Sequence, residues 1–226
     1  MKIQLRNKYL SRPRINRYLL ATGNDNLRAK RLYNANVRLA QAFHPILTQF
    51  EVILRNSLNQ QLSHHFGDTD WIINQRLGFM SNSSLRNSNY FLKRSVQKTE
   101  NKLRNRGIPI TSGKIVSDQN FGFWVALYLA HHYRLIGGEP IQIFANKPAS
   151  EDRAKIYAKL DDIRAFRNRT NHCEPLCFVG ATIDCSKALG IRTKLYNLIR
   201  WIEPELIPFF EEIDNVDNKA NALMQI

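Results

Sequence analysis

The sequence predicts an all-α protein, a helical bundle with additional peripheral helices. Apolar residues recur at intervals of three and four residues through most of the chain, which is the spacing of one helix face. Glycine and proline residues separate these segments where helices typically end. No internal repeat and no convincing pair of alternating strands interrupts the pattern, so we expect helices to form the whole core.

The composition is that of a globular, basic protein. Its 226 residues are 43% hydrophobic and 10% aromatic, which is more than a disordered chain contains. The 33 Lys and Arg residues outnumber the 19 Asp and Glu residues, for a net charge of +14. A positive field of this size attracts polyanions, and nucleic acid is the commonest of them. The alternative is that the charges lie on solvated helix faces.

Three features predict a cytoplasmic protein without a membrane partner. The longest apolar run, residues 121–130, has about half the length that spans a bilayer. The N-terminal residues lack the apolar segment of a secretion signal. Three cysteines are too few, and odd in number, for a disulfide scaffold, which favours a reducing compartment.

The chain is expected to begin with a basic N-terminal arm at residues 1–23, either a short helix or extended. A single domain is expected to fill residues 24–226. Most of the positive charge lies early, because residues 1–50 contain many Lys and Arg residues and one acid, Asp25.

The first helix of the domain is expected to start after an Asn24 or Asp25 cap. Its apolar spacing leads to Pro45, where we expect the helix to restart or kink. A strongly amphipathic helix continues beyond the proline and stops near Gly67.

In the middle of the chain, residues 71–73 are expected to form a short packed turn. A polar helix with one apolar face is predicted over residues 81–106, and Gly107 closes it. The segment 121–135 is apolar nearly all round, so it should be the most buried helix.

The last part of the chain is expected to contain three more helices. Ser150 and two following acids suit the start of the first, which Pro175 limits at its other end. After a turn at Gly180, helices are predicted over residues 191–201 and 205–213.

Residues suited to phosphodiester chemistry lie near the end of the helix that precedes Pro175. Asn168 and His172 are four residues apart and share one helix face, and the long side chain of Arg167 can reach round from beside it. Histidine can move a proton near neutral pH, arginine can hold a phosphate in two places, and asparagine can orient either group. The 2′-hydroxyl of RNA would be the nucleophile. The alternative is that these residues cap a helix end in solvent.

The wider segment RAFRNRTNHCEP, residues 164–175, resembles the Arg-x4–6-His motif of HEPN-fold ribonucleases. It is similar in particular to the Abi-like (abortive infection) branch of that family. Two further segments match in the same order: residues 50–56 resemble a Glu-x3-Arg-Asn helix of that branch, and residues 121–124 resemble the entry to its apolar helix. The resemblance covers roughly residues 25–200.

The resemblance implies a HEPN-like bundle and a metal-independent RNA endonuclease, a toxin or phage-defence effector. It implies Arg167, Asn168 and His172 as the catalytic residues. It also implies RNA as substrate and a homodimer that brings two motifs together, and a protein or RNA antitoxin would be a further partner. The residues expected to support catalysis or bind RNA are Glu51, Arg55, Asn56, Arg164, Arg169 and Asn171.

Other interpretations stay open. Glu51 and Arg55 have the spacing of an ordinary helix ion pair, worth about 0.2–0.5 kcal/mol on a surface. The adjacent histidine pairs at residues 64–65 and 131–132, and the three cysteines, lack the spacing of metal ligands, so no metal and no cofactor is expected. The alternative function is a catalytically inactive HEPN-type RNA-binding or sensing module, and a purely structural helical protein is a third.

Overall fold

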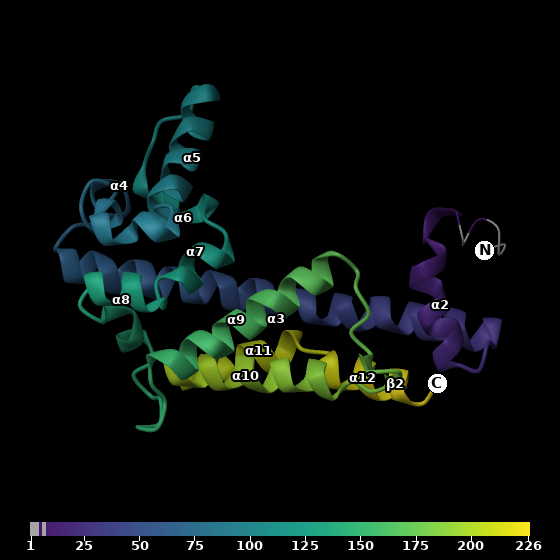
Figure 1. The fold of residues 1–226 in the computed structure, drawn as a ribbon. Helices are drawn as coiled ribbons and strands as arrows, with labels where there is room; N and C mark the ends of the chain where they lie inside the picture. The colour runs from purple at the N-terminus through teal and green to yellow at the C-terminus, as the bar shows by residue number, and fades with distance from the viewer. Residues whose placement is uncertain (1–4, 6–7) are drawn as a thin grey trace. The chain divides into compact units, whose positions relative to one another are not determined.

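The computed structural model describes residue 5 and residues 8–226 (Figure 1). Residues 1–4 and 6–7 of the predicted basic arm lie outside the described residues. The all-α prediction is confirmed. The α-helices are α2 (Arg12–Ala21), α3 (Asn26–Phe66), α4 (Trp71–Asn74), α5 (Phe91–Asn105), α6 (Ser112–Asp118), α7 (Phe121–Ala126), α8 (Ala130–Leu135), α9 (Arg153–Asn171), α10 (Ser186–Ile202), α11 (Ile207–Ile213) and α12 (Val216–Met224).

Short 3₁₀ helices and one hairpin complete the secondary structure of the described residues. The 3₁₀ helices are η1 (Phe79–Ser81), η2 (Ser83–Ser88), η3 (Glu139–Ile143) and η4 (Pro204–Leu206). The strands β1 (Phe178–Val179) and β2 (Thr182–Ile183) pair antiparallel, with Phe178 opposite Ile183. Gly180 lies in the turn between them with a φ of 61°, a conformation that glycine adopts without steric cost. No helix in the described part of the chain is long and apolar enough to cross a membrane.

The chain divides into two compact units. The first unit comprises residues 1–48, 165–196 and 207–226. The second comprises residues 49–164 and 197–206. The sequence-based division into an arm at 1–23 and a single domain at 24–226 stays a prediction, because compact units within a chain need not fold independently.

Aromatic contacts hold α2 and the hairpin in the first unit. Tyr18 of α2 is buried, and its ring meets those of Tyr33 and Phe178 edge-on at 5.3 Å each. Phe43 of α3 meets Phe166 of α9 at 4.6 Å in the same geometry. Contacts of this kind add about 0.5–1.5 kcal/mol beyond area burial. They join segments that lie far apart in the sequence.

α3 runs without interruption through Pro45, so of the two predicted outcomes, a restart or a kink, the restart is wrong. A proline inside a helix removes one backbone donor and crowds the preceding turn. Phe43, Ile46 and Leu47 around it are all buried, and their packing in the first unit offsets this cost.

The single helix predicted over residues 121–135 is wrong, because α7 ends at Ala126 and α8 begins at Ala130. Two side chains bind carbonyl groups at the break. The Nδ1 of His132 donates to the Ala126 carbonyl at 2.8 Å, and Nη1 of Arg153 donates to the Tyr128 carbonyl at 2.8 Å. The expected burial holds only for the first part of the segment: every residue from Phe123 to Tyr128 is buried, whereas His132 is the only buried residue of 129–135.

Several other elements differ from the predictions. The helix predicted from residue 81 starts only at Phe91, because Asn89 and Tyr90 take left-handed conformations with φ of 52° and 48°. At the start of α9, Asp152 rather than Ser150 caps the helix, accepting from the Lys155 amide at 2.8 Å, which lowers the pKa of Asp152. The helices α6 and α12 were not predicted, and α10 begins at Ser186 rather than at residue 191.

Candidate active site at the end of α9

α9 ends in a Schellman motif at the predicted catalytic segment. The Cys173 amide donates to the Thr170 carbonyl at 3.1 Å, and the Glu174 amide donates to the Arg169 carbonyl at 2.9 Å. Cys173 occupies the left-handed position of this motif, with a φ of 51° where glycine is usual. The chain therefore turns sharply just after His172, and the imidazole stands at the tip of the helix.

A buried asparagine from α3 holds the segment after the turn. Asn36 is 1% exposed, and its side chain makes hydrogen bonds with both ends of the segment 174–176. Its Oδ1 accepts from the Leu176 amide at 2.7 Å, and its Nδ2 donates to the Glu174 carbonyl at 3.4 Å. One amide side chain thus satisfies a buried donor and an acceptor that no helix partner reaches.

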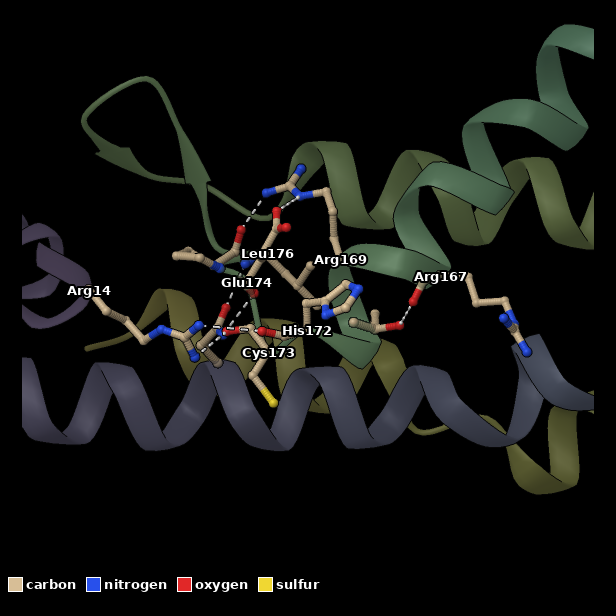
Figure 2. Close-up of polar contacts among 10 residues, drawn as sticks. Arg14, Arg167, Arg169, His172, Cys173, Glu174 and Leu176 are labelled. Atoms are coloured by element: carbon tan, nitrogen blue, oxygen red, sulfur yellow. Dashed lines mark hydrogen bonds and ion pairs between the residues drawn. The ribbon is translucent and has the colours of Figure 1, made fainter. Parts of the chain in front are cut away.

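Two arginines bind the same turn from outside, as Figure 2 shows. Arg14 of α2 donates to the carbonyls of His172 and Cys173 at 3.4 and 3.3 Å. Arg169 donates to the Glu174 carboxylate at 3.2 Å and to the Pro175 carbonyl at 2.5 Å. Cations suit a helix C-terminus, so both arginines also complement the dipole of α9.

The predicted catalytic residues share the end of α9 but do not form a closed cluster. Asn168 and His172 are exposed and one turn apart, since the His172 amide donates to the Asn168 carbonyl at 3.0 Å. Arg167 is half-buried, and Figure 2 shows its side chain pointing away from the His172 ring. The structure therefore brings Asn168 and His172 to one surface, whereas the guanidinium of Arg167 faces elsewhere.

A small pocket lies beside His172 in the first unit. Its volume is about 250 Å³. Thr170, Asn171 and Cys173 form one wall, and residues of α3 form the other: Asn36, Val37, Ala40, Gln41 and His44. Asn171, a predicted supporting residue, thus lines this pocket. The combination of an apolar patch with exposed amide and imidazole groups suits a small planar ligand with polar edges.

The remaining predicted supporting residues lie in the second unit, apart from Arg169. Glu51 and Arg55 are half-buried on α3, and Nε of Arg55 donates to Oδ1 of Asn56 at 3.4 Å. Arg164 forms an ion pair with Asp161 at 2.5 Å, three residues earlier on α9. The expected contact between these residues and the His172 turn stays a prediction.

The histidine pairs and two of the cysteines contact other protein groups or lie buried in the protein. His65 lies 3.3 Å from the Glu139 carboxylate, and His132 is completely buried. Burial raises the pKa of Cys177 to about 12 and that of Cys185 to about 11, so both thiols are protonated at neutral pH. Among the described residues, no three His, Cys, Asp or Glu side chains are grouped as metal ligands.

Sequence reasoning missed Asn36 and Arg14, which hold the turn after His172. Each contacts residues more than a hundred positions away, so spacing along the chain carries no signal for either. An asparagine on the apolar face of a helix, where Asn36 stands between Leu32 and Leu39, is the one clue that was present.

Comparison of the chain with protein-family models, with curated proteins and with solved structures finds no match in any of the three. The fold class therefore rests on the structure, and the family resemblance rests on the motifs alone.

Proposed function

We propose that this protein is a metal-independent RNA endonuclease of the HEPN type, a toxin or phage-defence effector. The 2′-hydroxyl oxygen attacks the adjacent phosphorus, and the bond from phosphorus to the 5′-oxygen breaks. The proton leaves the 2′-hydroxyl for a base, and the departing 5′-oxygen takes up a proton. The products are a 2′,3′-cyclic phosphate and a 5′-hydroxyl.

The observation that supports the proposal most is the placement of His172. Its ring is exposed at a helix tip, and the described residues form no hydrogen bond with its side chain. The backbone beside it is held by Asn36, Arg14 and Arg169. An imidazole that is open to solvent on a fixed backbone suits a general acid or base, which must meet its substrate in a defined geometry.

Asn168 and Arg167 have narrower roles in this proposal. Asn168, one turn before His172, would orient the phosphate or the imidazole. Arg167 would offset the negative charge that builds on the phosphorane. Because its side chain points away from His172, the arginine must rotate when RNA binds, and catalytic contacts commonly tighten only in the substrate complex.

A homodimer is part of the proposal, as the family resemblance implies. The reaction needs both a base and an acid, and one motif supplies one histidine. Two copies related by a two-fold axis would place two motifs against one strand. Light scattering of the purified protein tests this point, and a monomer that is fully active would refute it.

Cleavage of single-stranded RNA by the His172→Ala variant tests the catalytic assignment. We expect a loss of about 10²–10⁴-fold, because that is the usual contribution of a general acid or base. His64→Ala is the matched control, since His64 is also exposed but lies in the second unit. Unchanged circular dichroism must accompany the loss, and full activity of His172→Ala would refute the assignment.

The second candidate is an RNA-binding or sensing module without activity. The orientation of Arg167 favours it, because its side chain points away from the His172 ring. Purified wild-type protein in excess EDTA separates the two: an endonuclease degrades the RNA, and a binding module only retards it in a gel.

A further inference from the structure

Three cations converge around a groove on the first unit. Arg31 and Arg38 of α3 and Lys219 of α12 line a hollow of about 310 Å³, and Arg38 and Lys219 also line a second hollow of about 390 Å³. No acidic side chain lines either hollow. We name these two hollows, which share Arg38 and Lys219, the α3–α12 groove.

The groove cations differ from several other arginines of the first unit, which bind protein groups. Arg192 pairs with Asp214 at 2.5 Å and with Asp217 at 3.1 Å, and Arg28 donates twice to the carbonyl of Ile226. In the described part of the chain, the side chains of Arg31, Arg38 and Lys219 form no hydrogen bond and no ion pair. Like charges gathered around one hollow repel one another, and an anion in the hollow would relieve that repulsion.

The groove leads toward the candidate active site. Gln41 lines both the larger hollow and the pocket beside His172, so the two are neighbours across one side chain. Arg31, Arg38 and Gln41 lie along one side of α3, and the helical rise of 1.5 Å per residue spreads them over about 15 Å. A row of cations over this length can follow several phosphates of one strand.

We propose that the α3–α12 groove binds the phosphate backbone of single-stranded RNA and directs it to His172. The proposal rests on the proposed function for its direction, but backbone binding itself does not require cleavage. A single strand is the ligand because its bases are free to turn, and one of them can then enter the pocket beside His172.

Binding of a fluorescent 2′-O-methyl RNA oligonucleotide by the full chain tests the groove. This probe keeps the phosphates and lacks the attacking hydroxyl, so affinity is measured without cleavage. Arg38→Glu combined with Lys219→Glu should weaken binding at least about tenfold. The slope of log K against log salt should fall by about 1.4, at about 0.7 per single-strand phosphate contact.

The matched control is Arg106→Glu combined with Lys187→Glu. Both residues are exposed, line neither hollow, and change the net charge by the same amount. We expect this variant to bind within about threefold of the wild type. Equal losses of RNA affinity in the two double variants, or no loss in either, would overturn the proposal that the groove binds RNA. Lys219 is half-buried, so the groove double variant can lose helical signal. In that case the single variants Arg38→Glu and Arg106→Glu are compared instead, and weaker binding by Arg38→Glu alone supports the groove.

The result is independent of the test of the catalytic assignment. If His172→Ala cleaves RNA as well as the wild type does, the endonuclease assignment fails. The proposal that the groove binds RNA is then still tested by the binding comparison alone.

Discussion

Replacing Asn36 by leucine is expected to destabilise the protein and disturb the turn after His172. Leucine has nearly the same size but no polar atoms, so both hydrogen bonds to the segment 174–176 are lost. The Leu176 amide then stays buried without a partner, which costs about 1–3 kcal/mol. The lost bond to the Glu174 carbonyl adds about 0.5–1.5 kcal/mol. We expect the free energy of unfolding to fall by about 1.5–4.5 kcal/mol.

Urea denaturation followed by far-UV circular dichroism measures this change, provided that the slope of the transition is unaltered. Asn36→Asp is the matched variant, because it keeps an acceptor for the Leu176 amide and has a donor for the Glu174 carbonyl only while the new carboxyl is protonated. Its destabilisation should be the smaller of the two at a pH where the new carboxyl is protonated. The destabilisation by Asn36→Asp should grow as the pH rises, because the ionised carboxylate then faces the Glu174 carbonyl oxygen.

The same substitution separates the structural role of Asn36 from a direct role in chemistry. Asn36→Leu should lower RNA cleavage through a less ordered His172, and the loss should be larger near the melting temperature than far below it. A change of less than about 0.5 kcal/mol in stability would refute the reasoning, because surface substitutions typically fall in that range.

The other predictions concern pH, backbone strain and metal. Burial lowers the pKa of His132 from 6.5 to about 4, so the unfolded chain takes up the proton first as the pH falls. The free energy of unfolding is therefore unaffected by this histidine above about pH 6.5 and falls as the pH drops from there toward 4. The total loss is at most about 3 kcal/mol. His132→Gln should remove that part of the pH dependence, and an unchanged melting curve against pH would contradict it. Cys173→Gly should leave stability equal or higher, because the residue has a φ of 51°, whereas Cys173→Val should destabilise by about 1–2 kcal/mol. Thermal melts of the two variants check the order. Cleavage should survive excess chelator, and activity that vanishes with EDTA and returns with magnesium would contradict the proposed mechanism.

Much of the helical core could be predicted from spacing alone. Phe50, Leu54 and Leu58 recur at four-residue intervals, and all three are fully buried on one side of α3. Burial of one face stabilises a helix more than local propensity does, so the periodic pattern identifies the element and its inner face. The same reasoning located the end of α9, where the pattern stops before Pro175.

The errors arose where side chains from distant segments decide the local conformation. The break between α7 and α8 depends on Arg153 and His132, which bind carbonyl groups that an unbroken helix would satisfy itself. The helix through Pro45 persists because of burial on both sides of the proline. Neither effect can be derived from a window of neighbouring residues.

The local spacing of the candidate site residues could be predicted from the sequence, but their tertiary arrangement could not. The spacing of Asn168 and His172 on one face is a local property, and the structure keeps it. The orientation of Arg167 and the bonds from Asn36 depend on tertiary packing. A motif therefore indicates which groups are present, and the packing decides which of them can act together.

The net charge overstates how many cations can meet RNA. If each unit of the +14 excess bound one phosphate, the salt slope would be about −10. In the first unit, however, arginines such as Arg14 and Arg17 already hold protein carbonyls, and the guanidinium of Arg17 also lies 4.6 Å from the ring of Phe178. The three cations of the α3–α12 groove would by themselves give a slope of about −2. A measured slope near −2 that drops in the Arg38→Glu and Lys219→Glu variant would mean that a few converging side chains, rather than the overall field, bind the strand.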